Sequence, residues 1–169
     1  MERVNNLGEL PLERTVIGEA RLQYILVFGL ILVLGCFLRM DQLGSRSIWF
    51  DEAFTWKLIN GFGWGEMLVR AANDVHPPLY YAICRIWQFL AGDSLVVLRF
   101  PSVVFGLVTI ALVMASARAA IPPDLKRFRN STALWSGLII ALLPAHIRWS
   151  QELRMYALMA MLCVLSAAL

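Results

Sequence analysis

The sequence predicts an all-α polytopic membrane protein, and its composition and hydropathy pattern carry that prediction. Hydrophobic residues make up 59% of the 169 residues and charged residues only 16%, which lies outside the usual range for soluble domains. Uncharged apolar runs recur along the chain to the last residue. The net charge of +3 is too small an excess to predict a basic face for nucleic acid, so nucleic acid is not expected as a partner.

Four membrane spans are predicted, at about 22–38, 100–117, 131–145 and 155–169. The first is uncharged and close to the minimum length for a hydrocarbon core of about 30 Å. A secretory signal is an alternative for it, although the preceding segment is long and rich in Glu. The last run reaches the final residue without the polar residues that usually anchor a span. We therefore expect residues 1–169 to be a single membrane domain, the amino-terminal part of a longer protein.

Basic residues between the second and third runs predict the orientation of the chain. Arg118, Lys126, Arg127 and Arg129 crowd this short linker, and the positive-inside rule places it in the cytoplasm. Residues 39–98 then form a large first outer loop.

Within that loop, the apolar segment 77–91 opens with two prolines and carries Arg85, so it predicts an interfacial helix rather than a span. If it crossed the membrane instead, the basic linker would be exported. On the orientation that we expect, 148–154 also lies outside.

Two adjacent carboxylates, Asp51 and Glu52, lie among four aromatic residues in the segment 47–56 of the outer loop. Burial among such rings can tune a carboxylate for general-base catalysis. The structural alternative is that Asp51 caps a helix and that Glu52 complements its dipole. Further along, His76 precedes two prolines, so it could be a rigidly held substrate ligand or a simple turn residue. One histidine does not define a metal site.

A third polar cluster covers residues 146–156 at the outer ends of two predicted spans. Ser150 is a good helix N-cap, and free backbone N–H groups beside Arg148 and Arg154 could hold a phosphate. The alternative is a pair of snorkelling arginines with Glu152 as their partner. All three clusters fall on one side of the predicted membrane. The predicted spans carry no acid or base in their interiors, which argues against an ion-coupled transporter.

Together these motifs resemble the family 39 glycosyltransferases of the GT-C superfamily, which include protein O-mannosyltransferases and lipid A aminoarabinose transferases. The resemblance runs from about Arg39 to the end and covers the amino-terminal third of the family pattern. The segments that carry it are 46–53 (RSIWFDEA), 76–81 (HPPLYY), 92–94 with 98–102, and 150–158 (SQELRMYAL). It implies GT-C-like helices and an inverting enzyme that transfers a sugar from a polyprenyl-phosphate or dolichyl-phosphate donor. The acceptor would be a protein, lipid or glycan outside the cytoplasm.

The resemblance also implies roles for individual residues. Asp51 would be the general base, Glu52 its companion, and His76 a substrate ligand. The donor phosphate would be held by Gln151, Glu152, Arg154 and Tyr156. A divalent metal is an open expectation as a cofactor, because outer-loop acids can bind a metal in related transferases and the pattern does not say whether Glu52 or His76 would do so.

The same resemblance implies a multi-pass integral protein, of a bacterial cell membrane rather than the endoplasmic reticulum, with its active site facing outside. Two alternatives remain, namely a non-catalytic truncated protein or subunit and a small transporter.

Overall fold

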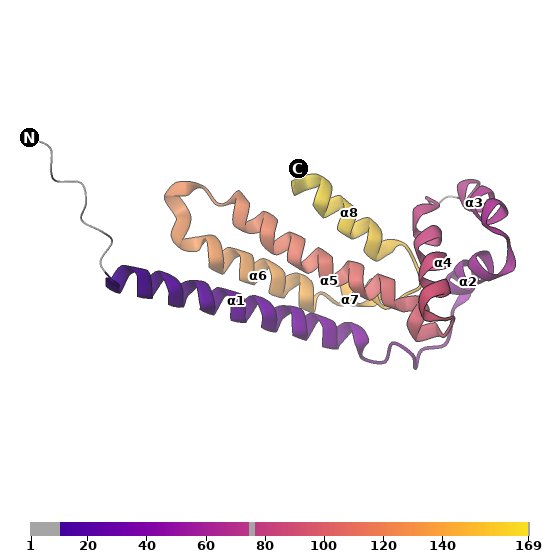
Figure 1. Ribbon diagram of the computed structural model, residues 1–169, viewed down its shortest axis with the longest axis horizontal. Helices are drawn as coiled ribbons and strands as arrows, with labels where there is room; N and C mark the ends of the chain where they lie inside the picture. The colour runs from indigo at the N-terminus through magenta and orange to yellow at the C-terminus, as the bar shows by residue number, and fades with distance from the viewer. Residues whose placement is uncertain (1–10, 75–76, 169) are drawn as a thin grey trace, which may run out of the picture.

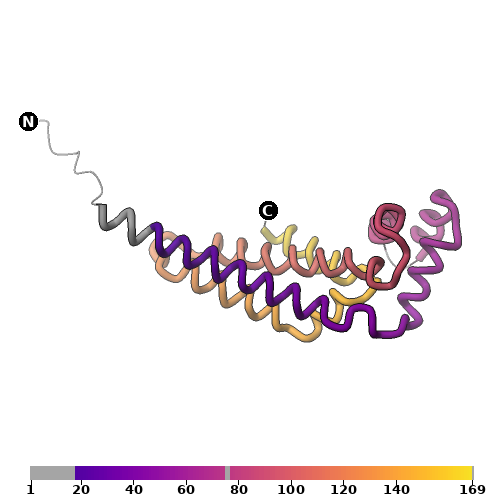
Figure 2. Tube along the Cα trace, turned by 60° about the horizontal axis from the view of Figure 1, so that its bottom comes forward, coloured from indigo at the N-terminus to yellow at the C-terminus, as the bar shows by residue number. Residues whose placement is uncertain are grey.

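The computed structural model describes residues 11–74 and 77–168, and this part of the chain is helical without strands. Three long helices run side by side, and three shorter ones gather at the end where α1 stops and α5 begins (Figures 1 and 2). The bundle contains α1 (Pro11–Met40), α5 (Leu95–Ala120) and α6 (Arg129–Leu142). The other elements are α2 (Phe50–Gly61), α3 (Trp64–Ala72), α4 (Leu79–Ala91), the 3-10 helix η1 (Pro123–Phe128), α7 (Pro144–Ser150) and α8 (Tyr156–Ala168).

Two of these helices are long and apolar enough to cross a membrane, namely α5 and the part Gly18–Met40 of α1. The outward face of α1 supports this assignment, because Leu30, Val33 and Phe37 are each 67% exposed. An apolar face of that kind favours contact with lipid over contact with water. The chain therefore fits a membrane protein.

The predicted first and second spans correspond to α1 and α5. The third corresponds to α6, which is long and apolar enough to cross a membrane only together with η1 and α7, across a bend of 64°. The fourth corresponds to α8, an apolar helix of 13 residues that is shorter than a crossing requires. The number of four spans stays a prediction.

The break between α6 and α7 is stabilised by the side chain of Arg39, which is fully buried at the end of α1. Pro144 begins α7, so the last carbonyls of α6 lose their helical donors. Arg39 donates to Ala141 O at 3.3 Å and to Ile140 O at 3.3 Å. It also donates to His146 Nδ1 at 2.7 Å. The bend thus has a specific partner on another helix.

Small residues let the helices of the bundle approach closely. A Cβ added to Gly106 on α5 would overlap the hydroxyl of Ser150 and lie 3.0 Å from Arg39 Nε. A Cβ on Gly137 would likewise overlap the side chain of Met114. Larger side chains at these positions would force α5 away from α6 and α7.

The predicted outer loop contains three helices, α2, α3 and α4, which form a small subdomain across the end of the bundle (Figure 1). The segment predicted to be interfacial forms α4, which runs across the direction of α5 in that view. The buried side chains of this subdomain share one core with residues of α5 and of the segment before α8. That core includes Leu58, Ile59, Met67, Tyr80, Cys84, Leu98 and Leu153.

Candidate functional site

The candidate site is built around residues 151–155, the buried segment that joins α7 to α8. Its first residue is attached to the end of α1, because Gln151 Nε2 donates to Leu38 O at 3.1 Å and to Asp41 O at 2.8 Å. Its middle is attached to α2, because Leu153 N donates to Glu52 Oε1 at 2.7 Å. The segment is therefore held between elements about a hundred residues away in sequence.

Glu52 and Arg99 form a buried ion pair that connects α2 to α5. Arg99 Nε donates to Glu52 Oε1 at 2.8 Å and Nη2 to Oε2 at 2.6 Å, and their side chains are 3% and 0% exposed respectively. Arg99 also donates to Leu43 O at 2.6 Å and to Arg46 O at 3.1 Å, in the segment that follows α1. Both carboxylate oxygens of Glu52 thus accept hydrogen bonds, and the pair anchors four parts of the chain.

Asp51 occupies a different environment from its neighbour Glu52. Its side chain is 34% exposed, and its Oδ2 lies 3.8 Å from Arg154 Nη2. Arg154 Nη1 also donates to the backbone oxygen of Asp51 at 3.3 Å. The Arg154 side chain is only 6% exposed, and its buried Nε has no hydrogen-bond partner within the described residues. An accessible carboxylate therefore stands beside a buried guanidinium that retains one unused donor.

Aromatic residues line the neighbourhood of Arg154. Its Cζ lies 5.8 Å from the ring centroid of Tyr156, a cation–π arrangement. Tyr81 donates its hydroxyl to Asp74 Oδ2 at 3.3 Å. Burial raises the pKa of Tyr81 to about 12, although the positive charge of Arg154 opposes this rise. Tyr81 is therefore a neutral hydrogen-bond donor at physiological pH.

A second contact holds the backbone of Arg154. The hydroxyls of Tyr80 and Ser102 lie 2.9 Å apart, and Ser102 Oγ donates to Arg154 O at 3.3 Å. Arg154 is thus positioned through both its side chain and its main chain.

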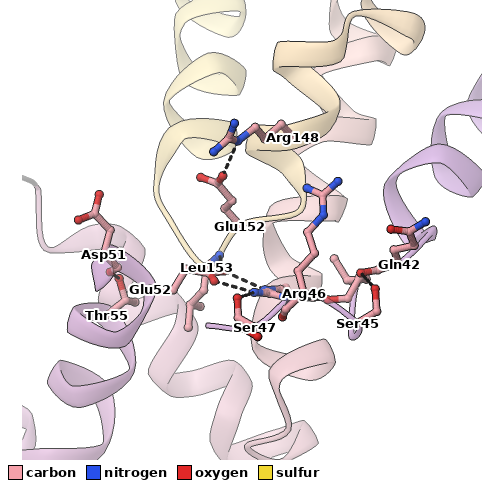
Figure 3. A network of polar contacts seen from close by, with 12 residues as sticks. Gln42, Ser45, Arg46, Ser47, Asp51, Glu52, Thr55, Arg148, Glu152 and Leu153 are labelled. Carbon is pink, nitrogen blue, oxygen red and sulfur yellow. Dashed lines mark hydrogen bonds and ion pairs between the residues drawn. The ribbon is translucent and has the colours of Figure 1, made fainter. Parts of the chain in front are cut away.

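The structure separates the predicted site residues into two groups. It brings together Asp51 and Arg154, and Tyr156 stacks on Arg154 while also lining a cavity with Glu152. Glu152 lies on the other side, where its Oε1 accepts from Arg148 Nε at 3.1 Å. Figure 3 shows Asp51 directed away from that pair. Gln151 is directed to the end of α1, and His76 lies outside the described residues.

Sequence reasoning assigned no role to Arg99 or Arg39, the two most extensively bonded arginines of the described chain. Arg99 begins an apolar run and Arg39 ends one, so both resemble ordinary interfacial anchors. The available signals were that each lies at the edge of a predicted span and that Arg99 falls within the motif segment 98–102. In the described part of the chain, no group of three or more His, Cys, Asp or Glu residues could hold a metal ion.

Comparisons of the chain with protein-family models, with curated proteins and with solved structures found no match. The resemblance to family 39 glycosyltransferases therefore stays a prediction from the motifs.

Proposed function

We propose that the chain is part of a lipid-carrier-dependent glycosyltransferase that transfers a sugar from a polyprenyl-phosphate donor to an acceptor hydroxyl. One observation carries the proposal: the partly exposed carboxylate of Asp51 lies beside Arg154 at the end of the candidate membrane helices. A lipid-linked phosphate would present its headgroup at this level. The motif resemblance supports the same activity.

In the proposed reaction, the acceptor oxygen attacks the anomeric carbon while the bond from that carbon to the phosphate oxygen breaks. Asp51 takes the proton of the acceptor hydroxyl, a role that its exposure permits. The lipid phosphate leaves with the bonding electron pair, and the guanidinium of Arg154 stabilises its negative charge. Attack opposite the leaving group inverts the configuration at the anomeric carbon.

Glu52 acts as a positioning residue in this proposal. Its bonds to Arg99 and to Leu153 N attach the first turn of α2 to the segment that carries Arg154. This arrangement fixes the separation of Asp51 from Arg154, on which transfer depends.

The proposed orientation places Asp51 outside the cytoplasm of a bacterial cell. The basic linker with η1 lies at the opposite end of the bundle from α2 (Figure 1). By the positive-inside rule the linker is cytoplasmic, and the site therefore faces outward.

The test uses membranes that contain the intact protein, radiolabelled polyprenyl-phosphate-linked mannose or glucose, and endogenous acceptors. Asp51→Asn should lower transfer about 100-fold to 10,000-fold, because the amide cannot take up the proton. Arg154→Ala should raise the donor dissociation constant about tenfold to a hundredfold. Lys57→Gln, an exposed change on the same helix, is the matched control and should transfer normally. A normal rate in Asp51→Asn would refute the proposal.

A second candidate is a non-catalytic membrane protein, and one observation favours it. The four charges nearest the site are paired with one another, Glu52 with Arg99 and Asp51 with Arg154, as in a purely structural network. In that case wild-type membranes would transfer no more label than membranes without the protein.

A further inference from the structure

A groove with two exposed arginines lies on the side of segment 151–155 that faces away from Asp51. It consists of two adjoining cavities of about 630 Å³ and about 660 Å³, which share Trp49, Pro144, Arg148 and Glu152 in their lining. The larger cavity also includes Trp149 and Tyr156, and the smaller one includes Arg46, Ser47, Ile147 and Gln151. We call it the arginine groove. Asp51 and Arg154 do not line it.

The arginine groove carries a net charge of +1. Arg99 and Glu52 also line it and neutralise each other as a buried pair. Arg148 is 68% exposed and uses only its Nε, on Glu152 Oε1. The guanidinium of Arg46 makes no hydrogen bond or ion pair with any described residue, and Figure 3 shows it on the side away from Asp51. The guanidinium groups of Arg46 and Arg148 and the carboxylate of Glu152 are therefore available to a ligand.

The groove lies at the level of a membrane interface. It follows the end of the candidate span in α1 at Met40 and includes α7, which begins after the 64° break that follows α6. Trp49 and Trp149 on its rim are 42% and 45% exposed. Tryptophan is enriched at the headgroup level of bilayers. A ligand in the groove would therefore meet the headgroup region of the lipids.

We propose that the arginine groove binds one phospholipid of the bilayer, with a monoanionic phosphodiester and a hydroxyl-bearing headgroup. Arg46 and Arg148 pair with the phosphate, whose single negative charge matches the net charge of the groove. Glu152 Oε2, which no described residue uses, accepts a headgroup hydroxyl. The acyl chains lie against Leu142 and Leu143, the exposed apolar side chains at the bend of α6 and α7.

The position of the groove distinguishes this lipid from a sugar donor. Figure 3 shows Arg148 and Glu152 across segment 151–155 from Asp51, so a phosphate paired with Arg148 lies on the other side of that segment from the carboxylate. The proposed lipid is therefore distinct from the sugar donor, although Tyr156 borders both sites. The lipid site also holds for either orientation of the chain in the membrane.

The test measures alkylation of a cysteine placed at Ser47, which lines the groove. The exposed Cys163 and the half-buried Cys36 are replaced by alanine, and the buried Cys84 is retained. The intact protein in detergent is treated with a maleimide in the presence of dioctanoyl phosphatidylglycerol or dioctanoyl phosphatidylcholine. Phosphatidylglycerol should slow the reaction at least about tenfold, and zwitterionic phosphatidylcholine should not. A cysteine at Ser45, which does not line the groove, is the control and should react at the same rate in both lipids.

Charge-removal variants make the assignment specific. Arg46→Gln with Arg148→Gln should abolish protection, whereas Lys126→Gln with Arg127→Gln in the basic linker should retain it. Arg46→Gln alone should weaken protection without loss of stability, because the Arg46 side chain makes no hydrogen bond or ion pair with a described residue.

Three outcomes would overturn the proposal. They are no protection, equal protection by both phospholipids, and displacement of phosphatidylglycerol by polyprenyl-phosphate-linked mannose at equal concentration. The first two outcomes refute only this lipid site. The third would also move the donor site of the proposed function into the groove, so the two failures can be told apart.

Discussion

The buried pair of Glu52 and Arg99 predicts a large loss of stability when its negative charge is removed. Glu52→Gln keeps the shape of the side chain and one acceptor for Leu153 N, but it leaves the Arg99 guanidinium buried without a counter-charge. Breaking a buried ion pair on one side costs about 3–5 kcal/mol. At about 2–4 °C per kcal/mol for a chain of this size, the melting temperature should fall by about 6–20 °C.

Thermal denaturation in detergent measures this loss. A thiol-reactive dye reports unfolding through Cys84, which is fully buried in the core, once Cys36 and Cys163 are replaced. Glu66→Gln is the control, because its pair with Arg70 is about half exposed and should be worth only about 0.3–0.5 kcal/mol. A melting temperature of Glu52→Gln within about 2 °C of the wild type would refute the reasoning. Glu52→Gln combined with Arg99→Met should recover part of the loss, because no unpaired charge remains buried.

Three further predictions concern packing, orientation and pH. Gly106→Ala should destabilise the protein by about 1–3 kcal/mol, whereas Gly29→Ala, which meets no atom within 4 Å, should melt at the wild-type temperature or slightly above it, because alanine favours a helix interior more than glycine does. A single cysteine at Asp74 should react with an impermeant thiol reagent in intact cells and one at Lys126 should not, and the reverse pattern would invert the orientation. Because the folded pKa of Tyr81 is raised from 10.0 to about 12, its protonated form contributes stability that is complete below pH 10 and is lost as the pH rises toward 12. Tyr81→Phe should reduce this alkaline loss in a pH series of melts, and an unchanged loss would contradict the assignment.

Hydropathy predicted the long helices well because a membrane imposes a length on each apolar run. The predicted runs at 22–38 and 100–117 lie within α1 and α5, and 77–91 contains the short helix α4. The bend at Pro144 was not predicted, although Pro144 is visible in the sequence. The partner that makes the break stable, Arg39, lies about a hundred residues earlier, and local patterns carry no information on that contact.

The same limit applies to the candidate site. The sequence grouped the four residues Gln151, Glu152, Arg154 and Tyr156 because they are adjacent. Their side chains diverge in the structure because the segment is not a regular helix and each residue meets a different neighbour. Asp51 and Glu52 differ for a related reason, since consecutive residues of a helix point about 100° apart. Glu52 is the buried carboxylate because it pairs with Arg99 and with the backbone of Leu153. These partners are distant in the sequence, and a single sequence gives no sign of such contacts.

The bonds from Arg39 to the end of α6 have a consequence for biosynthesis. Arg39 emerges from the ribosome about a hundred residues before Ala141 and His146, the groups that later surround it. Until they arrive, its guanidinium has to extend to the lipid headgroups, as arginines near helix ends do. Docking of the α6–α7 bend then withdraws this charge from the membrane surface. In a membrane, we therefore expect α1 of the nascent chain to reach its final depth and tilt only after α6 and α7 have been inserted.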